Sequence, residues 1–165
     1  MLLSTTGNIV SALAQSKLGS VLWAYYWGRA PEHLTGEDSG CQVRNCVAGE
    51  MKLGTPPEEL WPYVDSGPSF KQFPWKLFGA AIDQIGGYHR INSVGSQREE
   101  DIRLAISSGR AVIAGWVVSN QFCNEDPGTD LVDVRQKTEP IGGGHCMLIT
   151  DYTPNELLIC NSWSK

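Results

Sequence analysis

Gly142-Gly143-Gly144-His145-Cys146-Met147-Leu148-Ile149-Thr150-Asp151-Tyr152, near the end of the chain, begins as a glycine-rich turn and continues as an apolar strand. After the short turn Thr153-Pro154-Asn155, the stretch Leu158-Ile159-Cys160-Asn161-Ser162-Trp163 has the pattern of a second strand. The order of the two stretches predicts a β-hairpin. It carries a histidine at the start of one strand and an asparagine at the end of the other.

A histidine and an asparagine placed in this way suit nucleophilic catalysis. An imidazole that activates a thiol keeps one ring nitrogen toward the sulfur, so a third group must hold the other nitrogen. The amide oxygen of Asn161 could accept that hydrogen bond from His145 without adding a negative charge. The simpler interpretation is a glycine-rich turn leading into an ordinary strand, with Asn161 capping the next turn.

Gly144-His145 and Asn161-Ser162-Trp163 resemble the histidine and asparagine motifs of papain-like cysteine peptidases. The resemblance implies that His145 is the base, that Asn161 orients it, and that Trp163 shields their hydrogen bond from water. Gly143 and Gly144 would support the site by letting backbones approach closely. The segments 37–40 and 54–63 are similar to the middle part of the bacterial and phage branch of this family.

The same resemblance implies that the nucleophile is missing. Ser4-Thr5-Thr6-Gly7-Asn8 is similar to the residues around the family's catalytic cysteine, and this alignment puts Thr5 at the cysteine position. Met1 then falls where the family has its oxyanion-hole glutamine. A threonine hydroxyl is a far weaker acid than a thiol, and an internal threonine has no free amine of its own to act as a base.

Cys41 and Ser4 are the other candidate nucleophiles. Cys41 follows Ser39-Gly40 at an expected helix start, where a thiol pKa falls. However, the loop after that helix matches a family segment well downstream of the nucleophile, so Cys41 is expected to lie away from His145. Ser4 is adequately explained as a helix N-cap. His33 and His89 lack a partner motif and are expected to be surface or packing residues.

Composition is that of one globular domain. The chain has 165 residues, of which 41% are hydrophobic and 19% charged, and a formal net charge of −5. This charge gives no basic surface for nucleic acid. The apolar run Ala111 to Val118 is too short to span a bilayer, and the first residues lack the features of a secretion signal. A cytoplasmic or virion-associated protein without membrane contact is expected.

No cofactor or metal site is predicted. The five cysteines have no zinc-ribbon spacing, and reduced thiols are the default, with disulfides left open. Cys146 and Cys160 are expected to be buried within strands. The acidic loop 120–139 matches no standard calcium loop, and a solvated connection is the favoured interpretation.

Helices are expected mainly in the first half. Apolar spacing predicts a helix from Thr6 to about Leu18, a helical aromatic segment from Val21 to Gly28, and a helix that ends at Gly54. The acidic pair Glu37-Asp38 would lie at the start of this last helix. A further helix is expected from Trp75 to Ile85.

Strands are expected mainly in the second half. Tyr88 to Ile91 is strand-like, and Ser96-Gln97-Arg98-Glu99 reads as a capping box that opens a helix to Gly109. The clearest strands are 111–118, 147–152 and 157–160, which predict a small antiparallel sheet.

These elements predict an α+β protein with the papain-like division, a helical N-terminal lobe packed on a small antiparallel β-sheet. We expect one domain over residues 1–165, with a helical lobe at 1–86 and a β lobe at 87–165. The motif positions suggest truncation at both ends. The expected function is that of a degenerate papain-like peptidase with a peptide or protein partner. The alternative is a non-catalytic structural or interaction protein, for example in a phage or bacterial assembly.

Overall fold

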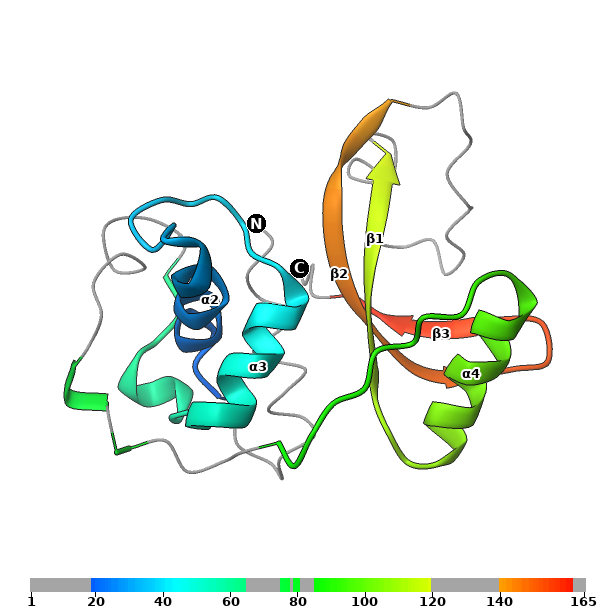
Figure 1. Cartoon of the computed structure of the whole chain (residues 1–165), viewed down its shortest axis with the longest axis horizontal. Helices are drawn as coiled ribbons and strands as arrows, with labels where there is room; N and C mark the ends of the chain where they lie inside the picture. The colour runs from blue at the N-terminus through cyan, green and yellow to red at the C-terminus, as the bar shows by residue number, and fades with distance from the viewer. Residues whose placement is uncertain (1–18, 65–74, 78, 81–84, 120–139, 162–165) are drawn as a thin grey trace.

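Helices form the first part of the described chain and a three-stranded sheet forms the last part (Figure 1). The computed structural model describes residues 19–64, 75–77, 79–80, 85–119 and 140–161. The predicted α+β architecture is confirmed. The predicted helix from Thr6 to Leu18 lies outside the described residues. Among the residues that are described, no helix is both long and apolar enough to cross a membrane.

Helix α2, Val21–Arg29, begins at a fully buried serine. Ser20 Oγ accepts a hydrogen bond from Trp23 N at 3.2 Å and donates one to Trp61 O at 2.9 Å. The backbone N–H of Ser20 donates to Pro56 O at 2.9 Å. One residue therefore caps the helix and fixes it to a distant loop. The predicted helical conformation of Val21 to Gly28 is confirmed.

Helix α3, Val43–Leu53, ends at Gly54 as predicted. The expectation that Glu37 and Asp38 lie at its start is wrong, because the N-cap is Gln42 and the first turn holds no acidic residue. The acidic segment instead folds back on α2, where Tyr25 Oη donates to Asp38 Oδ1 at 2.5 Å. A short 3-10 turn, η1 (Ala30–Glu32), connects α2 to this segment.

The core of the helical part is aromatic. Its buried cluster consists of Leu22, Trp23, Trp61 and Leu77. Trp23 Nε1 also donates to Gly54 O at 2.8 Å, so the end of α3 is tied to α2. A second 3-10 turn, η2 (Glu58–Leu60), leads into Trp61.

Two predicted elements are wrong in the described residues. Trp75–Leu77 is a single 3-10 turn, η4, and Gly79 has φ +95°, so no α-helix starts at Trp75. Residues 78 and 81–84 of that range lie outside the described part. Tyr88 to Ile91 has no regular structure, since no strand pairs with it among the described residues.

Helix α4, Ser96–Ser107, confirms the predicted helix but not its capping box. The N-cap is Gly95, with φ +60°, and no side chain caps the helix there. Ser96 is already the first helical residue, one position too late to act as the cap. Glycine tolerates the left-handed conformation that starts this helix.

The sheet consists of β1 (Val112–Ser119), β2 (Ile141–Tyr152) and β3 (Leu157–Cys160), in the order β1-β2-β3 with antiparallel pairing. The predicted small antiparallel sheet is confirmed, although β2 begins earlier than predicted. Residues His145 to Ile149 are all buried. Because neighbouring strand residues point to opposite faces, the middle of β2 is covered on both sides. Helix α4 contacts both β1 and β2.

Candidate active site

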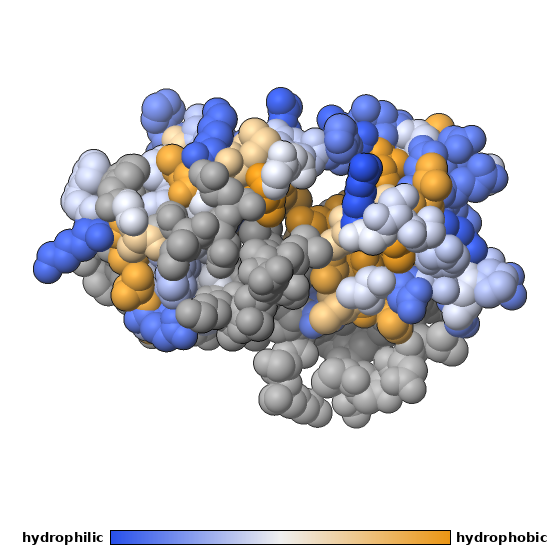
Figure 2. All heavy atoms as spheres, turned by 90° about the horizontal axis from the view of Figure 1, so that it is seen from below, coloured by the Kyte–Doolittle hydropathy of each residue, from blue (hydrophilic) through white to orange (hydrophobic). Residues whose placement is uncertain are grey.

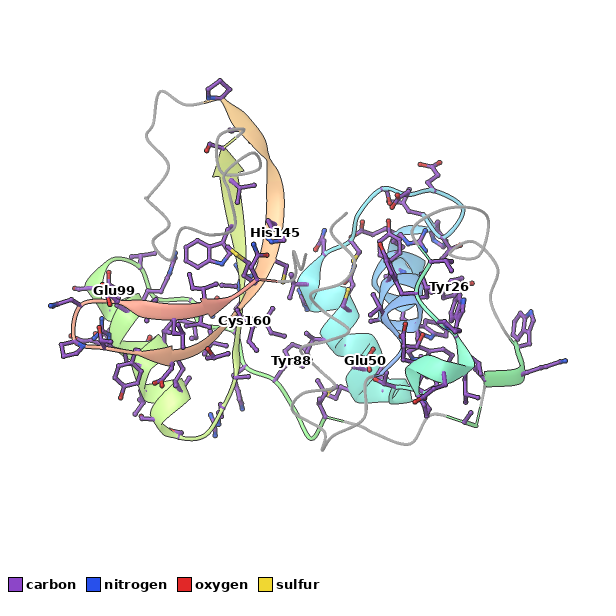
Figure 3. The ribbon with its side chains drawn as sticks, turned by 180° about the vertical axis from the view of Figure 1, so that it is seen from behind. Tyr26, Glu50, Tyr88, Glu99, His145 and Cys160 are labelled. Carbon is purple, nitrogen blue, oxygen red and sulfur yellow. The ribbon has the colours of Figure 1, made fainter. Side chains whose placement is uncertain are left out.

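His145 lies in the central strand and is only 4% exposed. Figure 3 shows it on the side of the sheet that is nearest to the helical part. Its ring therefore stands where the two parts of the molecule meet. A buried position keeps water from competing for the ring's hydrogen bonds.

Asn161 follows directly after β3 and bonds to His145. Nε2 of His145 and Oδ1 of Asn161 are 2.7 Å apart. The β2–β3 register pairs Leu148 with Cys160, and one more step would place Asn161 opposite Met147. His145 is two residues from Met147 on the same face, so it is the diagonal neighbour of Asn161. The register of the hairpin thus explains why the two side chains meet.

The hydrogen bond also assigns the ring's proton. An amide oxygen can only accept, so Nε2 of His145 donates to Asn161. In the neutral imidazole, Nδ1 is then the basic nitrogen, and it is the atom that would have to face a nucleophile. The pair has the geometry of a base and its orienting group.

The glycines before His145 lie within β2. Gly143 has φ +156° and is paired with Val118, where the β1–β2 register shifts one residue later. Gly144 is paired with Val117. Among the described residues, nothing lies within 4 Å of a Cβ added at either position. The expected close approach of a peptide backbone at these two glycines stays a prediction.

Two residues of the predicted site are not described. Thr5, at the predicted nucleophile position, and Trp163, the predicted shield, both lie outside the described residues, as does Ser4. Their predicted roles stay predictions. The same holds for the acidic loop 120–139. Within the described residues, no group of three or more His, Cys, Asp or Glu side chains could hold a metal ion.

Trp116 is a neighbour of His145 that the sequence did not reveal. It is the direct cross-strand partner of His145 in the β1–β2 register. Its Nε1 atom is buried and has no hydrogen-bond partner in the part of the chain that the structure describes. Directly opposite residues share one face of a sheet, so the indole lies beside the imidazole. Only the strand register, which the sequence alone does not specify, could have identified it.

Cys41, the rival nucleophile, lies two residues before α3 and is partly buried. Its Sγ atom is 3.1 Å from Sγ of Cys46. The pKa of Cys41 is lowered, first by the hydrogen bond with Cys46 and further by the charge of Arg29, while burial opposes the change. The cause of the lowered pKa is a second thiol rather than the helix start alone.

The two cysteines on the described strands differ in burial. Cys146 is buried, as predicted, and burial and the nearby Cys41 raise its pKa to about 11. Cys160 is exposed, so its predicted burial is wrong. It lies on β3, an outer strand of the sheet that the described residues form.

Figure 2 shows a hollow between the helical side of the molecule and the sheet side, with apolar atoms exposed in it. His145 lies on the part of β2 nearest to the helices (Figure 3). Binding sites in proteins are commonly concave and apolar with a few polar groups.

Two known proteins are similar to this chain. The chain is 28% identical over 153 residues to an uncharacterised peptidase C1-like protein of Acanthamoeba polyphaga mimivirus, covering 88% of this chain and 49% of that protein. It also resembles the crystal structure of xylellain, a cysteine protease from Xylella fastidiosa. The TM-score is 0.76 at 22% identity, covering 90% of this chain and 62% of that one. No protein-family model matches the chain.

The structural likeness shows a papain-like fold, as predicted. The likeness to xylellain, at 22% identity, concerns the fold, and the relative that is named peptidase C1-like is 28% identical. The chain spans about half the length of the curated relative that it matches. The bacterial and phage branch expected from the sequence stays a prediction.

Proposed function

We propose that this chain is a degenerate papain-like cysteine peptidase that keeps the base and its orienting group but has lost the nucleophile. The observation that supports this most directly is the 2.7 Å hydrogen bond between His145 Nε2 and Asn161 Oδ1. It leaves Nδ1 as the nitrogen that would take a proton from a nucleophile. His145 would be the base and Asn161 the group that fixes its ring.

The loss concerns Thr5, which the sequence places where the family has its cysteine. A thiol next to an imidazole can give up its proton to form a stable ion pair. A threonine hydroxyl cannot do so near neutral pH, and its extra methyl group crowds the attacking oxygen. We therefore propose little or no peptide hydrolysis by the chain as it stands.

The substrate class that we propose is peptide or protein bound near His145. No described residue lies within 4 Å of a Cβ added at Gly143 or Gly144, and this space would let an extended peptide approach β2. The hollow between the helical side and the sheet side offers a place for such a segment (Figure 2).

Restoring the thiol tests this proposal. We would compare casein hydrolysis by the unchanged chain, by Thr5→Cys, and by Thr5→Cys with an added N-terminal segment that supplies a glutamine. At least one repaired protein should cleave casein and be blocked by thiol alkylation, whereas the unchanged chain should not. Adding His145→Ala to the active form should abolish cleavage. Adding Cys41→Ser should leave it intact, which separates the two candidate thiols.

A second function is a non-catalytic interaction module that uses the papain-like fold. The absence of a thiol at position 5 favours it. If none of the folded, repaired proteins cleaves casein, the degenerate-peptidase proposal fails and this second function gains support. Cleavage by the unchanged chain would contradict both.

A further inference from the structure

Cys41 and Cys46 occupy special positions at the start of α3. Gln42 is the N-cap of this helix, so Cys41 is the residue before the cap and Cys46 is the fourth residue of the helix. These are the two positions that often pack together and fix the angle at which a chain enters a helix. Here both hold a thiol, and the two sulfur atoms are 3.1 Å apart.

The segment before Cys41 is firmly held on α2. Arg29 donates hydrogen bonds to the carbonyl oxygens of Leu34 at 3.3 Å and Thr35 at 3.1 Å, and also to that of Glu37. Gly40 N donates to Tyr25 Oη at 3.1 Å. The approach of Cys41 to Cys46 is therefore fixed from both sides, by α2 and by the first turn of α3.

Gly28 of α2 makes room for the two sulfurs. A Cβ atom at this position would collide with Cys46 Sγ and would lie 2.9 Å from Cys41 Sγ. The thiol pair thus packs on bare helix backbone. Three separate features of the chain, two cysteines and a glycine, combine to bring these sulfurs together.

We propose that Cys41 and Cys46 are a redox pair. A low-molecular-weight disulfide such as oxidised glutathione would oxidise them, and the product would be an intramolecular disulfide between the two cysteines. The sulfurs need to approach by only about 1 Å to reach bonding distance, which a change of side-chain torsion can supply. This proposal is independent of the one for His145 and Asn161.

The reaction takes place in two exchange steps. The Cys41 thiolate attacks one sulfur of oxidised glutathione, forms a mixed disulfide and releases one glutathione thiolate, which takes up a proton. The Cys46 thiol then loses its proton to solvent, attacks Cys41 Sγ and releases the second glutathione. Two protein thiols are oxidised and one glutathione disulfide is reduced to two thiols.

Exposure and charge favour this order. Cys41 is partly exposed, whereas Cys46 is 1% exposed, so the oxidant meets Cys41 first. The hydrogen bond with Cys46 lowers the pKa of Cys41, and the same bond, together with burial, raises the pKa of Cys46. Capping Cys41 removes the neighbouring negative charge, which makes the Cys46 thiol easier to ionise for the second step.

Trypsin offers a direct test, because Arg44 lies between the two cysteines. Cleavage after Arg29, Arg44 and Lys52 places Cys41 in the peptide 30–44 and Cys46 in the peptide 45–52. The full chain would be treated with excess oxidised glutathione, unfolded in the presence of an alkylating reagent so that every remaining thiol is blocked, and digested without reductant. We expect the two peptides to be joined, with a mass lower than their sum by two hydrogen atoms, and to separate after reduction.

Variants make the result specific. Cys146→Ser should form the same linked pair, whereas Cys46→Ser should leave Cys41 as a mixed disulfide with glutathione. Oxidation should also raise the midpoint of thermal unfolding of the unchanged chain by several degrees, with no such rise in Cys46→Ser. The proposal is overturned if both thiols of the unchanged chain are still alkylated after oxidation, or if Cys41 is found joined to a cysteine other than Cys46.

Discussion

Nε2 of His145 on β2 and Oδ1 of Asn161 just after β3 are 2.7 Å apart, across a hairpin whose turn is only a few residues long. Because the two strands are antiparallel and adjacent, the pair forms as soon as the hairpin register is set.

Asn161→Ala should release the imidazole ring. In a Thr5→Cys protein that cleaves casein, we expect this change to lower kcat roughly 10- to 100-fold, since a hydrogen bond to a group that becomes charged is lost. A slowly exchanging Nε2 proton of His145 should also disappear from the proton NMR spectrum, even in the inactive chain. Asn155→Ala, on the exposed hairpin turn, is the matched control. It should change neither kcat nor the Nε2 proton signal of His145. An unaltered Nε2 resonance in Asn161→Ala would contradict the proposed role.

Glu50→Gln should change how stability depends on pH. Glu50 on α3 is 1% exposed, and its carboxylate oxygens have no hydrogen-bond partner among the described residues. Burial raises its pKa to about 8. An unfolded glutamate has a pKa of about 4.3, so between these two pKa values the folded state keeps a proton that the unfolded state releases. The contribution of Glu50 to the free energy of unfolding is therefore greatest below the unfolded pKa. It decreases as the pH rises above that value and is lost once the pH has passed the folded pKa.

The measurement for Glu50 is urea unfolding at pH 5 and pH 9. Relative to Glu50→Gln, the unchanged chain should lose about 3–4 kcal/mol of unfolding free energy between these two pH values. Glu100→Gln, on the exposed side of α4, should behave like the unchanged chain. Equal losses in Glu50→Gln and the unchanged chain would show that Glu50 is not neutral in the fold.

The hairpin of β2 and β3 could be predicted from sequence because its signals are local. An apolar run, a short turn and a second run predict it, and the hairpin register places Asn161 next to His145. Helices α2 and α3 were predictable for the same reason, since Gly54 and the apolar spacing act within a few residues.

Other features depend on contacts between distant segments. Trp116 meets His145 only through the β1–β2 register, and the strands are separated by the residues 120–139. Glu50 reads as a normal polar helix residue, but packing buries it. The start of α4 was misplaced because Ser96 and Glu99 fit a capping box, whereas the left-handed conformation of Gly95 decides the first helical residue.

Gly49→Ala should destabilise the contact between α2 and α3. A Cβ atom at Gly49 would lie 2.8 Å from Cβ of Trp27, so the helices would have to move apart. Overpacking of this kind costs about 1–3 kcal/mol, against a gain of up to about 1 kcal/mol from replacing a helical glycine by alanine. We expect a net loss in unfolding free energy, measured by urea denaturation. Gly36→Ala is the control, since no described residue lies within 4 Å of a Cβ added there, and a more stable Gly49→Ala would refute the tight packing.

Ser20→Ala should weaken the attachment of α2 to the loop that carries Trp61. Ser20 Oγ caps the helix through Trp23 N and donates to Trp61 O, and the residue is fully buried. Alanine would leave a buried donor and a buried acceptor unsatisfied, at a cost of about 2–4 kcal/mol. Ser107→Ala removes only an exposed bond to Leu104 O, so it should change the unfolding free energy by less than about 0.5 kcal/mol. If urea denaturation gives the same small change for both variants, water must replace the lost hydroxyl at Ser20, and the bond to Trp61 does not hold the loop in place.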